Sequence, residues 1–87
     1  MREGELLQAL EALADELSID VRYEALESAG GLCQYGGKMH LIIPRDLTAR
    51  QRVDALADAL ARQSLDDVFV RPQVRDFLRN RAGDNDA

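Results

Sequence analysis

The fold is decided by Gly31-Leu-Cys-Gln-Tyr-Gly-Gly-Lys-Met-His-Leu-Ile-Ile43, in which two short apolar segments flank a pair of adjacent glycines. Adjacent glycines readily adopt the positive φ angles of a type I′ turn, so this stretch predicts a β-hairpin closed by Gly36-Gly37. A two-residue turn also sets the register, with Tyr35 opposite Lys38 and the other residues paired outward from there.

Side chains alternate between the two faces of a hairpin, so the register also divides them. One set is the more apolar and should meet the helices: Leu32, Gln34, Met39, Leu41 and Ile43. The other set should be partly solvated or covered by another subunit: Cys33, Tyr35, Lys38, His40 and Ile42. This second set is our candidate interaction surface.

The residues before the hairpin predict one helix and one strand. Leucines at positions 6, 10, 13 and 17 recur with the helical period, which indicates an amphipathic helix over residues 5–17. From Ile19 to Glu24 apolar and charged residues alternate, which is typical of a half-buried strand. Residues 24–31 have little periodicity and predict a loop.

The residues after the hairpin predict two helices. Pro44 ends the strand, and Thr48-Ala-Arg-Gln51 is a capping box that opens a helix through about Gln63. Val68-Phe-Val70 is expected to be a turn or a short extended piece that packs on the core. Pro72 suits the first turn of a third helix, which should end at Gly83.

The element order is therefore helix, strand, strand, strand, helix, helix. It predicts an α+β domain over residues 1–83, with a three-stranded antiparallel or mixed sheet, and a frayed acidic tail over residues 84–87. Three short helices on one side of such a sheet cannot cover both of its faces. An exposed sheet face, or a dimer that covers it, should follow.

Composition excludes several classes of protein. The chain has 87 residues, a net charge of −5 and one cysteine, Cys33, so no intrachain disulfide can form. The negative charge argues against general affinity for nucleic acid. Neither a transmembrane helix nor the apolar core of a signal peptide can be drawn, so we expect a cytoplasmic bacterial protein that does not bind membranes.

Cys33 opposite His40 is the one pair that resembles a nucleophile beside a base, with β-carbons about 5 Å apart in the hairpin register. A histidine can activate a thiol, so a small-molecule, redox or metal site around Cys33 and His40 is an alternative function. The sequence identifies no third group to orient the imidazole and no oxyanion donors. We therefore assign no catalytic residue, no metal ligand and no cofactor.

Arg71, Arg75 and Arg79 recur every four residues in the third predicted helix, with Arg81 following, and form a basic face. Nucleic-acid binding through this face is an alternative function, although aromatic residues for base stacking are not interleaved with the arginines. We favour an electrostatic contact with the acidic first helix of the same or another subunit.

The stretch Leu41-Ile-Ile-Pro-Arg-Asp-Leu-Thr-Ala-Arg-Gln-Arg-Val-Asp-Ala-Leu-Ala-Asp-Ala-Leu-Ala-Arg62 resembles the strand and active-site helix of IrrE-like zincin metallopeptidases. The H-E-x-x-H motif of that family falls on Asp58, Ala59 and Arg62, so both zinc ligands and the base are missing. The resemblance therefore implies a shared core without peptidase chemistry.

A resemblance to small uncharacterised bacterial proteins covers most of the chain. It is carried by Gly31-Leu-Cys33 before the hairpin turn and by the ending Leu65-Asp-Asp-Val-Phe-Val-Arg-Pro-Gln-Val-Arg-Asp-Phe-Leu78. It implies no activity. From the residues themselves we expect a non-catalytic protein-interaction module, a homodimer that uses the candidate interaction surface or a free edge of the sheet.

Overall fold

The computed structural model describes the backbone of residues 1–25 and 31–85 and the side chains up to Arg81. In chain order, the elements are α1 (Glu3–Glu16), β1 (Ile19–Glu24), β2 (Gly31–Tyr35), β3 (Lys38–Pro44), α2 (Ala49–Leu60) and α3 (Pro72–Asn85). This order confirms the predicted α+β class. The loop predicted over residues 24–31 falls mostly on residues 26–30, outside the described residues.

The three strands form one mixed sheet in the order β1-β3-β2. The central strand β3 pairs in parallel with β1 and antiparallel with β2. The antiparallel pair is the predicted hairpin, because Gly36 and Gly37 have φ angles of +60° and +78° and Tyr35 lies opposite Lys38. The register derived from the turn is confirmed along the whole of β2.

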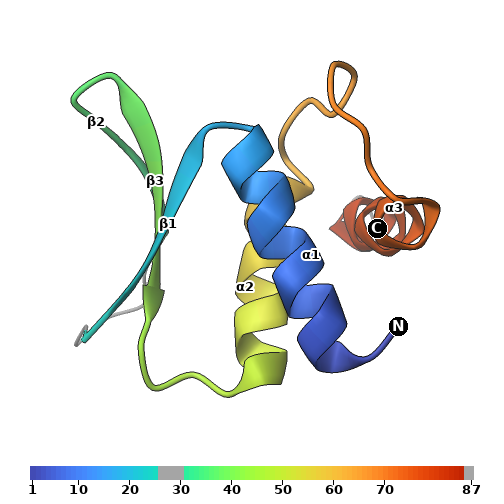
Figure 1. The fold of residues 1–87 in the computed structure, drawn as a ribbon, viewed down its shortest axis with the longest axis horizontal. Coiled ribbons are helices and arrows are strands. Elements are labelled where there is room, and N and C mark those ends of the chain that lie inside the picture. Colours follow the sequence, from blue (N-terminus) through green and yellow to red (C-terminus); the bar gives the residue numbers. More distant parts are fainter. Residues whose placement is uncertain (26–30, 86–87) are drawn as a thin grey trace.

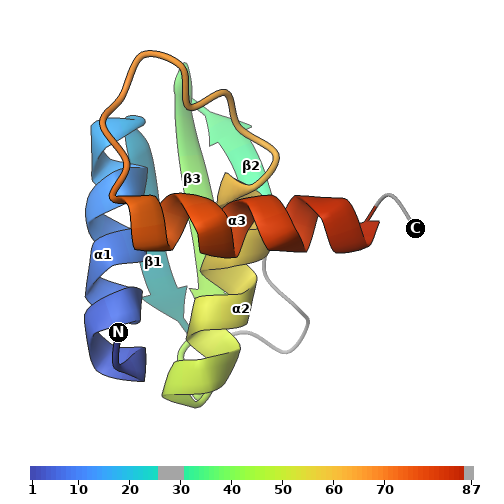
Figure 2. The ribbon, with the colours of Figure 1, turned by 90° about the vertical axis from the view of Figure 1, so that its right-hand side faces the viewer.

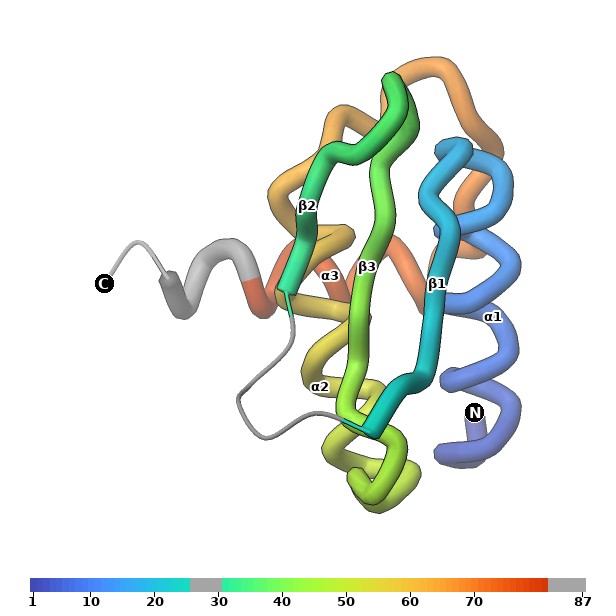
Figure 3. The backbone as a smooth tube through the Cα atoms, turned by 90° about the vertical axis from the view of Figure 1, so that its left-hand side faces the viewer, coloured from blue at the N-terminus to red at the C-terminus, as the bar shows by residue number. Residues whose placement is uncertain are grey.

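The molecule has three layers (Figure 1). The sheet forms the first layer, α1 and α2 lie side by side behind it, and α3 forms the third. Figure 2 shows α3 crossing the two other helices at a steep angle on the side away from the sheet. In the described part of the chain all three helices therefore lie on one side of the sheet, and Figure 3 looks onto the opposite, open face.

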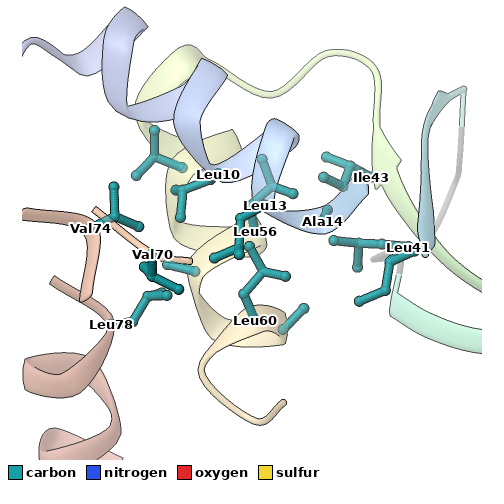
Figure 4. Close-up of a cluster of buried hydrophobic side chains, with 14 residues drawn as sticks. Leu10, Leu13, Ala14, Leu41, Ile43, Leu56, Leu60, Val70, Val74 and Leu78 are labelled. Carbon is teal, nitrogen blue, oxygen red and sulfur yellow. The ribbon is translucent and has the colours of Figure 1, made fainter. Parts of the chain in front are cut away.

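The core fills the spaces between these layers (Figure 4). Leu41 and Ile43 point from β3 toward α1 and α2, as predicted for their face of the hairpin, and Ile43 is 1% exposed. On the other side of the helix pair, α3 and the residues before it supply the buried side chains Val70, Val74 and Leu78. Full burial of one such side chain stabilises the fold by about 1.5–3 kcal/mol.

The start of α2 agrees with the prediction, whereas the C-terminal ends of α2 and α3 differ from it. The capping box of α2 is present: Thr48 Oγ1 accepts from the Gln51 N–H at 3.2 Å, and Gln51 Oε1 accepts from the Thr48 N–H at 2.9 Å. The helix ends at Leu60, three residues before Gln63. The prediction that α3 ends at Gly83 is wrong, because the helix continues to Asn85. An interior glycine weakens a helix by about 1 kcal/mol but need not end it.

The segment before α3 behaves as predicted only in part. Val70 is buried in the core, whereas its neighbour Phe69 is 79% exposed. The rest of the predicted acidic tail, residues 86–87, lies outside the described residues.

Candidate interaction surface on the open face of the sheet

The open face of the sheet collects alternate residues from three strands. They are Asp20, Arg22 and Glu24 from β1, Lys38, His40 and Ile42 from β3, and Gly31, Cys33 and Tyr35 from β2. The five residues of the candidate interaction surface all lie on this face. The structure thus brings together the predicted set and adds the β1 residues, whose place beside β3 the sequence did not reveal.

The apolar part of this face is a shallow depression of about 310 Å³. It is lined by Arg22, Glu24, Cys33, Tyr35, His40 and Ile42. Tyr35 stands at its rim with 77% of its surface exposed, and its ring meets the His40 ring edge to face at a centroid distance of 6.1 Å. An aromatic ring this exposed has much apolar surface left for a partner to cover.

The polar part of the face is a row that crosses the sheet from β2 to β1. Cys33 lies opposite His40, and Asp20 lies beside His40 on the other side. His40 Nδ1 is 3.2 Å from Asp20 Oδ2, and the same oxygen accepts a hydrogen bond from Arg22 Nε at 3.1 Å. The Arg22 hydrogen bond and the positive charges nearby hold the pKa of Asp20 below its ordinary value of 3.8.

Asp20 is the functional candidate that the sequence reasoning missed. Its position beside His40 depends on the parallel pairing of β1 with β3, and no turn joins those two strands to set their register. One signal was available: the alternation over Ile19–Glu24 placed Asp20 and Arg22 together on the polar face of β1.

The chemistry open to Cys33 is that of an exposed free thiol. In the described residues, no group of three or more histidine, cysteine, aspartate or glutamate side chains is placed to hold a metal ion. Cys33, His40 and Asp20 together thus place a thiol near an imidazole that a carboxylate orients.

The predicted basic face remains at the surface, since Arg71, directly before α3, and Arg75 and Arg79 within α3 are all exposed. Arg81 turns inward instead, with Nε 2.6 Å from Asp58 Oδ1 and Nη2 3.2 Å from Asp54 Oδ1. Among the described residues of the chain, the ion pairs of α3 go to α2. The predicted contact with the acidic first helix is therefore not seen within one chain in the described residues, and a contact with that helix of another subunit stays a prediction.

Asp58, where the zincin motif would place a zinc ligand, is bound to Arg81. Of the helices in the described part of the chain, none has the length and apolar character needed to cross a membrane. No protein-family model matches the chain, and no curated protein or solved structure matches it.

Proposed function

We propose that this protein is a non-catalytic interaction module that associates with a second copy of itself through the open face and the strand β2 that borders it. The observation that carries the proposal is the exposed Tyr35 beside an apolar depression, on a face that the described helices leave uncovered. Exposed apolar surface rimmed by polar residues is typical of protein-binding sites.

The charges on the open face favour a second copy over a strongly charged partner. The chain carries a net charge of −5, which would repel another copy at most surfaces. The open face is balanced, because the carboxylates of Asp20 and Glu24 are matched by Arg22 and Lys38. A surface whose charges balance does not repel its own copy, and a symmetric dimer brings the same patch of both chains to its interface.

We also place the protein in the reducing cytoplasm of a bacterium, where a lone exposed cysteine stays a thiol. Association there cannot depend on a disulfide, so it must rest on packing and hydrogen bonds between the copies.

Sedimentation at micromolar concentration tests the proposal. We expect a concentration-dependent dimer that Tyr35→Glu converts to a monomer, because the substitution replaces an exposed ring at the contact by a charge that must be desolvated. Phe69→Glu is the matched control, since Phe69 is as exposed as Tyr35 but lies away from the sheet. A chain that is monomeric throughout, or a dimer that responds to Phe69→Glu instead, overturns the proposal.

A second candidate function is favoured by Asp20, which supplies the orienting group that the sequence did not reveal. If His40 activates Cys33, the thiol reacts with iodoacetamide at neutral pH faster than free cysteine, and His40→Ala slows it. Asp20→Asn should slow it less, because the imidazole remains but is no longer held. A thiol no faster than free cysteine, or one insensitive to His40→Ala, ends this candidate.

A further inference from the structure

The backbone of β2 presents hydrogen-bonding groups on both of its sides. In the type I′ turn, the Tyr35 carbonyl accepts from the Lys38 N–H, so Tyr35 forms a hydrogen-bonded pair with β3. Hydrogen-bonded and non-hydrogen-bonded pairs alternate along an antiparallel ladder. Cys33 and Gly31 therefore also bond to β3, whereas the N–H and C=O groups of Leu32 and Gln34 point away from the sheet.

The hydrogen bonds between β3 and β1 independently show the same alternation of backbone direction along β3. The Arg45 N–H, which follows β3 directly, donates to the Glu24 carbonyl at the end of β1 at a distance of 2.8 Å. The odd-numbered residues of β3 thus bond to β1, and the even-numbered ones bond to β2. His40 is even-numbered, which agrees with its hydrogen-bonded pairing to Cys33.

Among the described residues, the outer edge of β2 has few of the features that usually prevent strands from pairing. Proteins protect edge strands with charged side chains, prolines, bulges or covering segments. Gly31–Tyr35 contains no charged residue and no proline. In the described part of the chain no strand pairs with the outer side of β2, although α3 runs past this edge on the far side of the other two helices (Figure 2). This edge is therefore open to another strand.

A second β2 fits this edge in one register. Two antiparallel copies of a five-residue strand overlap completely only when the middle residue, Cys33, lies opposite its own copy. In that register Leu32 of each chain lies opposite Gln34 of the other. Both residues direct their backbone groups outward, so the two chains satisfy each other's free N–H and C=O groups.

We infer that two copies of this chain join through β2 in this register, which places Cys33 on the two-fold axis of a continuous six-stranded sheet. The inference rests on the proposed function and specifies the geometry of the association. The open faces of the two copies then lie side by side, so the inference assigns the contact to the β2 border of the proposed surface, and the two apolar depressions flank the axis.

The side chains agree with this register. Tyr35 lies opposite Gly31 of the other copy, where no heavy atom stands within 4 Å of the place a β-carbon would take, so the ring has room to cover the glycine. Leu32 lies opposite Gln34, and no charged residues of β2 oppose one another. The two Cys33 residues form a non-hydrogen-bonded pair, whose Cα atoms are about 4.5 Å apart, within the range of a disulfide.

Oxidative cross-linking tests the register on the native protein. Copper phenanthroline and oxygen oxidise a pair of thiols to a disulfide by removing two electrons and two protons. At concentrations where sedimentation shows a dimer, we expect the two Cys33 thiols to form this disulfide and so a covalent dimer. The controls move the cysteine and keep Tyr35. C33S/Q34C turns the thiol to the other face, and C33S/G31C separates the two sulfurs by about 14 Å along the strands. Both controls should cross-link at least tenfold more slowly.

The results of the cross-linking experiment distinguish a wrong register from a failure of self-association itself. A dimer in which Cys33 does not cross-link, or in which C33S/G31C cross-links equally fast, keeps self-association but overturns this register. A chain that stays monomeric overturns both.

Substitution of Gln34 provides a second test that does not use the thiol. Gln34→Pro removes an outward N–H and leaves the bonds to β3 intact, so the circular dichroism of the monomer should not change. The symmetric dimer loses two hydrogen bonds, which should raise its dissociation constant about tenfold. Gln34→Ala keeps the N–H and should associate normally. Equal affinities for the two variants contradict the register.

Discussion

The two edges of the sheet, β1 and β2, flank the same central strand but differ in almost every other respect. On the open face, β1 carries the charged residues Asp20, Arg22 and Glu24, and α1 packs against its inner face. The five residues of β2 include no charge, and Cys33 and Tyr35 are exposed. Charge discourages pairing at one edge, whereas nothing in the sequence of the other opposes it.

The β1 edge is also tied to the helices by its side chains. The Tyr23 hydroxyl donates to Glu11 of α1, and the Arg52 guanidinium of α2 lies 4.8 Å from the centre of the Tyr23 ring. Burial, together with the hydrogen bond to Glu11, raises the pKa of Tyr23 above its ordinary value. From this difference between the edges we infer that β1 stabilises the fold of a single chain. The β2 edge, in contrast, forms the contact between two chains.

The largest expected loss of stability comes from a substitution in β3, the central strand that pairs with both β1 and β2. Ile43→Ala should lower the free energy of unfolding by about 2–5 kcal/mol, because the side chain is fully buried between the sheet and the helices. Ile42→Ala is the matched control on the open face, and it should lower the stability of the monomer by less than about 1 kcal/mol. Urea unfolding of dilute protein checks both. Similar losses of stability in the two variants would mean that the open face of the sheet is as well covered as the face that packs on the helices.

A change in the hairpin turn should weaken the β2 edge alone. Gly36→Ala forces an alanine to a φ of +60° and should lower stability by about 1–2 kcal/mol. Gly4→Ala in the first turn of α1 meets no neighbouring atom and should raise stability by up to about 1 kcal/mol. Hydrogen exchange should locate the loss from Gly36→Ala in β2, with β1 unaffected. Equal loosening of β1 would show that the two edges are not independent.

A change in the tyrosine should weaken the β1 edge and reveal its dependence on pH. Tyr23→Phe removes the hydrogen bond to Glu11 and should lower stability by about 1 kcal/mol at neutral pH. The raised pKa means that the folded state favours the neutral hydroxyl. The unfolded chain ionises near 10.0, so the contribution of Tyr23 is fully present below that pH and is lost above it.

Unfolding curves of the two proteins between pH 7 and 11 check this dependence. The stability advantage of the unmodified chain over Tyr23→Phe should shrink above pH 10. An advantage that grows with pH would contradict the assigned hydrogen bond.

The features predicted correctly from sequence are those fixed by residues close together in the chain. The Gly36-Gly37 turn determines the register of β2 with β3, and Thr48 with Gln51 determines the start of α2. The alternation over Ile19–Glu24 determines that β1 is a strand, but not which strand it joins.

The features that were missed depend on contacts between distant residues. Asp20 reaches His40 only through the parallel pairing of β1 with β3, and Arg81 reaches Asp58 only through the way α3 crosses α2. Such placements follow from packing of the whole core, on which no local pattern reports. The open face was foreseen because it follows from counting elements: three helices on one side leave the other side uncovered.

Hydrogen exchange at the individual amides of β2 tests the central claim most directly, the pairing of this strand with a second copy. We predict that the amides of Leu32 and Gln34 are protected at concentrations where the dimer forms and lose this protection on dilution. The amides of Cys33 and Tyr35, which bond to β3, should stay protected at both concentrations. Unprotected Leu32 and Gln34 amides in a sample that sedimentation shows to be dimeric would contradict the claim.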